Sequence, residues 1–263
     1  MPERAELERA LDPWPPGGSP ALADRELGPL RLGATTANVA ELPGKSPPGR
    51  LPRDVTGNGI AGLLSDLVHS GATVLAVAAH APHRARALGG RVGGFAVCSW
   101  LALEDDPGLA EGFAHVVALD PPAHAHRRDL LDGLPGAGWT HMAWGEPELR
   151  FARRIHEWDY ALRAPLTAVY RAVRAAGGGE GEALEATLRG DDPQPRSPAL
   201  GGRLVRVLSE LGLVVLEHEG HALRVAEAPA RTALERSAAF RAYRQRLEDG
   251  LRYLTTSTAR AAA

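Results

Sequence analysis

The stretch FAHVVALDPP, residues 113–122, decides the expected fold of this chain. It is a short, nearly continuous apolar run that ends in an aspartate and two prolines. Such runs are typical of strands buried on both faces of a parallel sheet. Similar runs lie at 73–81, 93–100 and 138–145, and segments with helical periodicity lie between them at 58–71, 82–88 and 125–134. This alternation predicts an α/β fold with a small parallel sheet flanked by helices.

The second half of the chain has a different order of elements. A long helical segment at 146–179 is expected to divide near Pro165, because proline interrupts a helix. Further helices are expected at 181–190 and at 197–212, the latter opened by Ser197. Two strands around a turn follow at 213–227. Three helices followed by a hairpin predict a winged-helix-like α+β domain.

A long amphipathic helix is expected at the C-terminal end. It places five large apolar side chains on one face, those of Phe240, Tyr243, Leu247, Leu251 and Leu254. The expected division of the chain is an irregular Pro/Gly-rich N-terminal segment at 1–55, a parallel α/β lobe at 56–160, and a winged-helix-like domain with the C-terminal helix at 161–258.

Prolines dominate the N-terminal segment. The phrases DPWPPGGSP and LPGKSPPGRLP are unsuited to a long helix or a central strand, because proline fixes φ and lacks a donor. We therefore expect loops there, with one or two edge strands around GPLRLGA, residues 28–34.

Composition and charge exclude several classes of protein. Hydrophobic residues make up 44% and charged residues 24%, with a net charge of −2, so the whole molecule has no strong attraction for nucleic acid. The charge is uneven: from Arg163 onward there are 15 basic and 12 acidic residues. Cys98 is the single cysteine, which excludes a disulfide framework. With no signal peptide or membrane-spanning run visible, a cytoplasmic location and no membrane partner are expected.

Asp120 stands where a nucleotide hydrolase often places its metal-binding carboxylate. A phosphate loop would have to accompany it, with glycines, a lysine and a hydroxyl. The nearest candidate, Gly44-Lys45-Ser46, has Val39 at the first glycine position and is flanked by prolines. We therefore expect Asp120 to cap the next helix or to hydrogen-bond the loop at the carboxyl edge of the sheet.

Histidines cluster around the same strand end, at His115, His124 and His126. The HAH spacing does not place two ligands on one helical face, and no carboxylate with metal-ligand spacing joins them. Solvated or capping histidines are expected, with no metal, no cofactor and no catalytic residue in this chain.

Arginines follow two of the predicted strands. Arg84 and Arg86 come after the first strand, and Arg127 and Arg128 come after LDPP. Because the carboxyl ends of parallel strands share one edge, these side chains could bind an acidic partner peptide there. The alternative is that they form ion pairs with Asp129, Glu104 or Asp105.

The winged-helix-like domain offers a second set of arginines. The third helix offers Arg203 and Arg206, the hairpin offers Arg224, and the last helix offers Arg241, Arg244 and Arg246 for contact with DNA phosphates. The acidic residues Glu210, Glu217 and Glu219 dilute that surface, and a domain used only for packing or protein contact is the alternative.

Four longer phrases resemble the C-terminal region of the RecJ family, over about residues 56–258. They are GIAGLLSDLVHSGATVLAVAAHAPHRARAL, FAHVVALDPPAH, THMAWGEPELRFARRIHEWDYALRAPLTAVYRAVR and RSAAFRAYRQRLEDGLRYL. The resemblance implies a bacterial 5′→3′ exonuclease that acts on single-stranded DNA in repair and recombination, with manganese or magnesium held by an Asp-His-His core. That core and the family's glycine-rich motif are not found in this sequence, so no catalytic residue is carried over.

The resemblance implies an accessory tail, whose sheet is similar to a helicase lobe without a phosphate loop. Its implied partners are the RecJ catalytic core, the acidic C-terminal peptide of single-strand-binding protein and, weakly, single-stranded DNA. Two alternatives from other classes are a degenerate nucleotide hydrolase that uses the carboxyl edge and a winged-helix regulator that recognises duplex DNA.

Overall fold

The computed structural model describes residues 30–32, 49–57, 59–89, 92–190, 196–217, 222–227 and 232–261. These described residues divide into two compact units. The sheet unit comprises those between Glu26 and His156 and those from Asp249 onward, and the three-helix unit comprises those between Glu157 and Glu248. The C-terminal helix was predicted to belong wholly to the second domain, whereas its described residues from Asp249 onward belong to the sheet unit.

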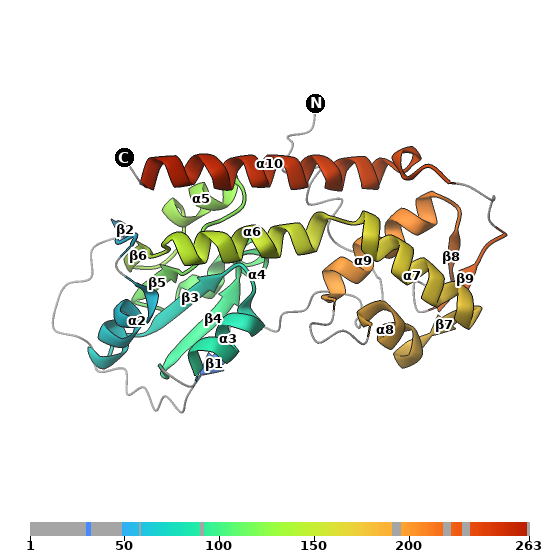
Figure 1. Cartoon of the computed structure of the whole chain (residues 1–263). Coiled ribbons are helices and arrows are strands. Elements are labelled where there is room, and N and C mark those ends of the chain that lie inside the picture. Colours follow the sequence, from blue (N-terminus) through green and yellow to red (C-terminus); the bar gives the residue numbers. More distant parts are fainter. Residues whose placement is uncertain are drawn as a thin grey trace. The chain divides into compact units, whose positions relative to one another are not determined.

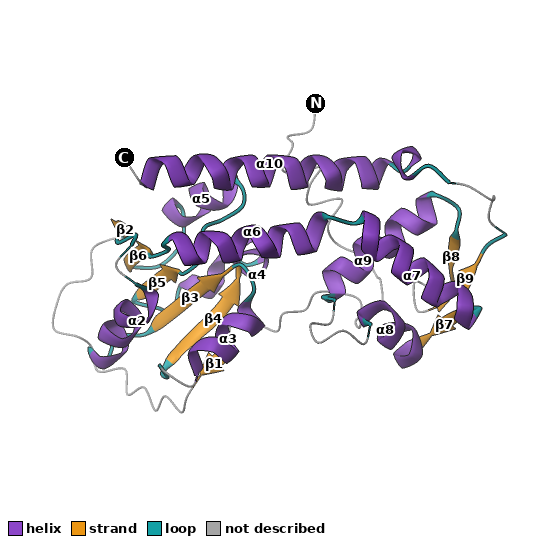
Figure 2. Ribbon diagram, viewed as in Figure 1, coloured by secondary structure: helices purple, strands orange, loops and turns teal. Residues whose placement is uncertain are grey.

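The sheet unit contains a six-stranded sheet in the order β1-β4-β3-β5-β6-β2. Its strands are β1 (Leu30–Leu32), β2 (Arg50–Asp54), β3 (Val74–Ala78), β4 (Phe95–Ser99), β5 (His115–Ala118) and β6 (Gly138–Met142). Five strands run parallel, and β1 pairs antiparallel with β4 at one edge (Figures 1 and 2). The predicted parallel sheet is confirmed, and β1 is the edge strand expected within GPLRLGA.

Helices cover both faces of this sheet. On one face, α2 (Ile60–His69) and α3 (Ala81–Gly89) pack against alternate residues of β3, β4 and β5. On the other face lie α4 (Trp100–Asp105), the short 3-10 turn η1 (Pro107–Ala110) and α5 (Ala125–Asp132). Every residue of β3 and β4 is buried, which explains why these strands are apolar throughout and do not alternate.

Strand β2 is a second edge strand within residues 1–55, at Arg50–Asp54, whereas edge strands were expected there only around residues 28–34. It pairs with β6 on one side only, and the Val55 amide donates to the Met142 carbonyl oxygen at 2.9 Å. Because the backbone groups of alternate residues face opposite sides, the nitrogen of Pro52 faces away from β6, as is usual for proline in an edge strand. Arg50 anchors the strand, because its guanidinium donates to the carbonyl oxygens of Pro135 and Phe113, each at 2.8 Å, and to that of Ala110. No local sequence pattern predicts these contacts of Arg50, because their partners lie 60 to 85 residues away in the chain.

Two helices cover the carboxyl edge of the sheet. They are α6 (Glu146–Tyr160) and the C-terminal half of α10 (Ala238–Ala261). Leu149 and Ala152 of α6 form a buried cluster with Leu254 of α10, packed against Ala79 and Ala123 in the loops that follow β3 and β5.

Gly250 permits the close approach of these two helices. A Cβ atom added at Gly250 would lie 2.1 Å from His156 Nε2 on α6. A side chain at position 250 is therefore incompatible with the observed packing, since interiors are close-packed.

The three-helix unit contains α7 (Arg163–Ala176), α8 (Gly181–Arg189), α9 (Pro198–Glu210), the short turn η3 (Leu234–Arg236) and the start of α10. Three antiparallel strands, β7 (Gly178–Glu180), β8 (Val214–Glu217) and β9 (Ala222–Val225), form a small sheet in the order β7-β9-β8. The predicted break near Pro165 is confirmed, since this residue lies in the first turn of α7. Ser197 caps α9 as expected, accepting a hydrogen bond from the Leu200 amide at 3.1 Å.

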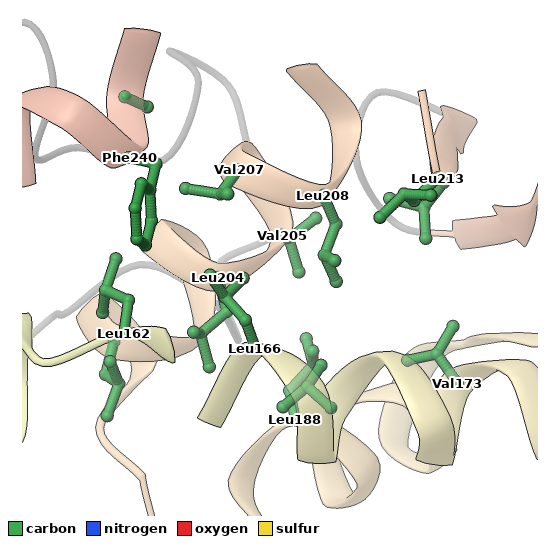
Figure 3. Packing of buried hydrophobic residues seen from close by; sticks show 14 of the residues in the cluster. Leu162, Leu166, Val173, Leu188, Leu204, Val205, Val207, Leu208, Leu213 and Phe240 are labelled. Carbon is green, nitrogen blue, oxygen red and sulfur yellow. The ribbon is translucent and has the colours of Figure 1, made fainter. Parts of the chain in front are cut away.

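Helix α9 lies inside the core of the three-helix unit (Figure 3). Its buried apolar residues are Leu200, Leu204, Val205, Val207 and Leu208. Glu210, at its end, accepts hydrogen bonds from Ser237 Oγ at 2.8 Å and from the Ala239 amide at 2.9 Å. The start of α10 is thereby fixed against the end of α9.

Across the part of the chain that the structure describes, no helix combines the length and the apolar character that crossing a lipid bilayer requires.

Candidate functional site

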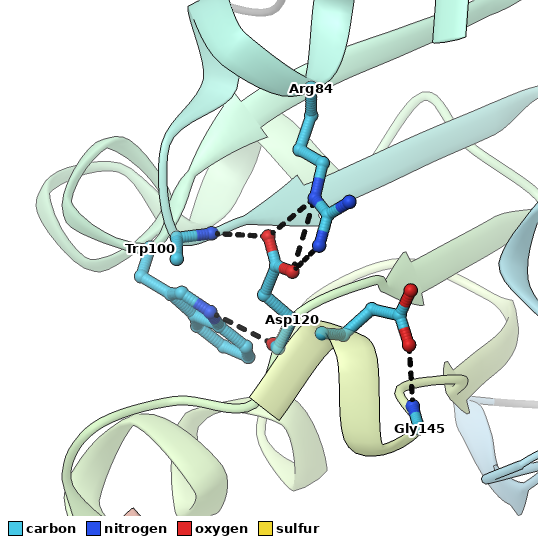
Figure 4. A network of polar contacts seen from close by, with 6 residues as sticks. Arg84, Trp100, Asp120 and Gly145 are labelled. Atoms are coloured by element: carbon cyan, nitrogen blue, oxygen red, sulfur yellow. Dashed lines mark hydrogen bonds and ion pairs between the residues drawn. The ribbon is translucent and has the colours of Figure 1, made fainter. Parts of the chain in front are cut away.

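Asp120 is the centre of a polar network at the end of β5 (Figure 4). The residue is fully buried, and Arg84 Nε lies 3.1 Å from each of its carboxylate oxygens. The Ala79 amide donates to Asp120 Oδ2 at 2.9 Å, and Trp100 Nε1 donates to the Asp120 carbonyl oxygen at 3.2 Å. Asp120 therefore joins the loop after β3 and helix α3 to the end of β5.

The environment of Asp120 accounts for its structural role. Burial raises the pKa of Asp120, and the hydrogen bonds from Arg84 and from the Ala79 amide oppose that rise. Arg84 is itself packed over the ring of Phe151, at 4.3 Å from the ring centroid. The prediction that Asp120 hydrogen-bonds the loop at the carboxyl edge is confirmed, and Arg84 is the partner that sequence reasoning missed.

Arg84 therefore differs from the exposed docking contact that was predicted. Its side chain is 12% exposed and forms an ion pair with Asp120. The reason is tertiary: the two residues are 36 positions apart and meet only because β3 and β5 are neighbours in the sheet.

A basic surface lies beside this network on α3 and α6. Its members are His80, His83, Arg86 and Arg154, and we call it the α3–α6 basic surface. Among the described residues, no ion pair involves Arg86 or Arg154, and both are exposed. The predicted candidate Arg86 thus lies on an open, positively charged surface.

The pKa of His83 is lowered by burial and by the positive charges of this surface. Its ring packs against Phe151 at a centroid distance of 4.8 Å, and its backbone amide donates to His80 Nδ1 at 3.2 Å. Burial lowers the pKa of His83, and the positive charges of His80, Arg84, Arg86 and Arg154 lower it further.

The candidates on α5 are engaged with acidic residues. Arg127 contacts Glu104 through Nε at 3.1 Å and through its terminal nitrogen at 3.0 Å, and His126 Nε2 lies 3.1 Å from the same carboxylate. Burial alone would raise the pKa of Glu104, but the hydrogen bond from His126 and the charge of Arg127 outweigh it and lower the pKa to about 2. Arg128 pairs with Asp132 at 3.1 Å. The structure thus shows ion pairing for Arg127 and Arg128, with Glu104 as one of the partners considered in advance.

The histidines need one correction. His124 was expected to be solvated or capping, but it is buried and makes no side-chain capping bond to α5. Its ring stacks on His126 at 5.5 Å and meets the ring of His156 edge-on at 5.3 Å. Helix α6 brings His156 to it, which no local pattern indicated.

A second histidine pair lies on β5 and β6. His115 Nδ1 is 2.9 Å from His141 Nε2, and His141 is buried. Burial, together with the charges of His115 and Arg53, lowers the pKa of His141 to about 4. Within the described residues, no three His, Cys, Asp or Glu side chains are grouped as a metal ion would require.

The candidate DNA contacts on the three-helix unit are corrected in part. Arg203 is 4% exposed, donates to the Asp159 carbonyl oxygen at 3.2 Å and lies 4.3 Å from the ring centroid of Tyr160, so it cannot reach a phosphate. Arg206 Nε is 3.4 Å from Glu210, and Arg224 Nε is 2.7 Å from Glu217. The carboxylates that were expected to dilute this surface neutralise these two arginines directly.

Two further predictions fall on residues outside those described: the Gly44-Lys45-Ser46 segment and Glu219.

Comparisons of this chain with protein-family models, with curated proteins and with solved structures find no match.

Proposed function

We propose that this chain is the accessory C-terminal portion of a RecJ-like 5′→3′ single-stranded-DNA exonuclease of repair and recombination. In this proposal it docks an acidic partner peptide, the C-terminal tail of single-strand-binding protein, on the α3–α6 basic surface. The resemblance of four phrases over residues 56–258 supports the family, and the charge of that surface supports the ligand.

The observation that carries the docking proposal is the set of cations around His83. Arg86 and Arg154 are exposed, and no carboxylate among the described residues neutralises them. Guanidinium groups bind carboxylates through paired, charge-assisted hydrogen bonds, so an acidic peptide is the complementary ligand. Arg84 contributes its charge but not its hydrogen bonds, which Asp120 occupies.

The α5 arginines contribute less in this proposal. Arg127 and Arg128 each already contact a carboxylate, so a peptide would have to compete with Glu104 or Asp132. We therefore place the docking contacts on Arg86 and Arg154, with Arg128 as the matched control.

Two observations favour an accessory role over hydrolysis at the sheet edge. Both carboxylate oxygens of Asp120 accept hydrogen bonds from within the unit. Leu149 and Leu254 cover the loops that follow β3 and β5, where a nucleotide would bind in a parallel sheet. The manganese or magnesium of the family belongs in this proposal to the catalytic core that carries the Asp-His-His residues.

We further propose that the three-helix unit is a winged-helix-like domain used for packing. The order helix, strand, helix, helix, strand, strand from α7 to β9 supports that description. Because α9 is buried and Arg203 lies inside, this helix is unsuited to entering a DNA groove.

The docking test is a titration of a fluorescently labelled acidic tail peptide into the full chain, followed by anisotropy at low salt. Arg86→Ala with Arg154→Ala should weaken binding by about tenfold or more, because two charge-assisted contacts are lost. Arg128→Ala should leave the affinity unchanged. A peptide that does not bind, or that binds the double variant as tightly as the wild type, would contradict the docking surface.

A separate assay tests the accessory role. The full chain is incubated with single-stranded DNA and manganese, and in parallel with ATP and magnesium. Neither DNA degradation nor ATP turnover is expected, and robust activity in either assay would overturn the accessory role.

A further inference from the structure

Helix α7 carries arginines and no acidic residue. Its sequence is RAPLTAVYRAVRAA, with Arg163, Arg171 and Arg174 as its charged residues. Leu166 and Val169 face the core of the three-helix unit. The three arginines are all exposed, and the side chain of Arg163 is 68% exposed.

The arginines of α7 form a stripe along one side of the helix. At about 100° per residue, Arg163, Arg171 and Arg174 fall within a sector of about 80°, and they span about 17 Å along the axis. No ion pair among the described residues involves Arg171 or Arg174. The stripe is therefore a row of positive charge along a rigid element.

The stripe continues onto the start of α10. Arg163 pairs with Glu235 at 2.7 Å, and Arg244 lies 4.0 Å from the same carboxylate. Arg241 donates to backbone carbonyl oxygens of Glu235 and Arg236, at 2.6 Å and 3.3 Å, and no ion pair among the described residues involves it.

We propose that this region, the α7–α10 basic surface, binds the phosphate backbone of duplex nucleic acid without reading its sequence. Its members are Arg163, Arg171, Arg174, Arg236, Arg241 and Arg244. Within the described residues, the carboxylates in contact with these six guanidinium groups are those of Glu235 and Glu248. The surface is thus strongly positive, although the chain as a whole carries a net charge of −2.

The side chains of the surface favour a duplex over a single strand. Proteins that hold single strands stack bases on exposed aromatic rings. Here Phe240 is buried beneath Arg163, and Tyr170 packs against the core. The exposed charged side chains of this surface are arginines, and the half-buried ring of Tyr170 is packed against the core, so the surface responds mainly to charge density, which is greater along a duplex. Arginine forks bind phosphate oxygens in pairs, so they suit this ligand.

This surface shares Arg241 and Arg244 with the DNA contacts expected from the sequence, but its α7 arginines are distinct from those expected on α9 and the hairpin. Arg206 and Arg224 each pair with a glutamate, whereas Arg171 and Arg174 pair with none among the described residues. The two sets belong to the same unit, so variants of one serve as controls for the other.

The test is a titration of the full chain with a labelled duplex of arbitrary sequence, a single strand of the same length and an acidic peptide, over a series of salt concentrations. Arg171→Ala with Arg174→Ala should weaken duplex binding by about tenfold at low salt. The slope of log affinity against log salt should become shallower by about 1.8, since each lost phosphate contact removes about 0.9. Arg206→Ala with Arg224→Ala should leave both quantities unchanged, and circular dichroism should show all variants folded because these side chains are exposed or half-exposed.

Four results would overturn the proposal. They are a duplex that does not bind at low salt, equal binding by the Arg171/Arg174 variant and the wild type, tighter binding of the single strand at this surface, and loss of acidic-peptide binding in the Arg171/Arg174 variant. Because the peptide-docking test uses residues of α3 and α6, failure of one proposal leaves the other measurable.

Discussion

Removal of Arg84 should cost the sheet unit more stability than removal of any exposed arginine. Asp120 is 0% exposed and Arg84 is 12% exposed, so the pair is shielded from water. Loss of one partner of a buried ion pair typically costs about 3–5 kcal/mol, because the remaining charge is left uncompensated. We expect Arg84→Met to lower the free energy of unfolding by about that amount at pH 7. After the change, the Ala79 amide would still donate to Asp120.

The pH dependence of that variant has a definite sign. Without Arg84, burial raises the folded-state pKa of Asp120 further above its unfolded value. A raised pKa contributes stability below the unfolded pKa and loses it as pH rises through the folded pKa. The deficit of Arg84→Met relative to the wild type should therefore shrink as the pH falls from 7.

Urea unfolding followed by tryptophan fluorescence and far-UV circular dichroism measures these effects. Trp100 is a local reporter, because its indole donates to the carbonyl oxygen of Asp120. Asp120→Leu with Arg84→Met should cost at least about 2 kcal/mol less than the sum of the single changes, since no buried charge remains. Arg128→Ala, which breaks an exposed pair with Asp132, should cost at most about 0.5 kcal/mol. A cost below about 1 kcal/mol for Arg84→Met, or strict additivity in the double variant, would refute the reasoning.

Three further predictions concern the sheet unit. Gly250→Ala should destabilise it by about 1–3 kcal/mol through the clash with His156. Gly62→Ala, in open space on α2, should stabilise it by about 0.5–1 kcal/mol. Changes of the melting temperature with the same sign in both variants would contradict this pair of predictions. His141, with a pKa of about 4, stays neutral in the folded state while the unfolded side chain is protonated below about pH 6.5. As the pH falls from about 6.5 to about 4, the free energy of unfolding should therefore fall by up to about 3 kcal/mol. In urea titrations, His141→Gln should make this fall smaller. The pKa of Glu104 is about 2, so its carboxylate contributes to stability above its unfolded pKa, and up to about 2 kcal/mol of the free energy of unfolding should be lost as the pH falls from 4.5. If Glu104→Gln leaves the fall of stability with acid unchanged, the ion pairs of Glu104 do not stabilise the fold.

The sequence by itself determined the elements whose signals are local. Apolar runs such as 73–81 predicted buried parallel strands, because burial on both faces leaves no polar side of the strand. Ser197 predicted the start of α9, since its hydroxyl satisfies an amide three residues on. The hydrogen-bonding role of Asp120 at the strand end was also expected, because the sequence places no phosphate loop of the required composition with it.

The tertiary structure decided which charged groups meet. Arg84 finds Asp120 across 36 residues, and Arg203 finds Asp159 across 44. Those pairings follow from strand order and helix packing, which a local sequence pattern does not predict. As a result, Arg84, a predicted docking residue, and Arg203, a predicted DNA contact, both make their polar contacts inside the fold.

Exposure was decided in the same way. Arg171 and Arg86 remain accessible because their helices turn only one face to a core. Helix α9 is enclosed because α10 is fixed against its end through Glu210. Sequence periodicity gives the apolar face of a helix, but the number of elements packed around that helix is a property of the folded chain.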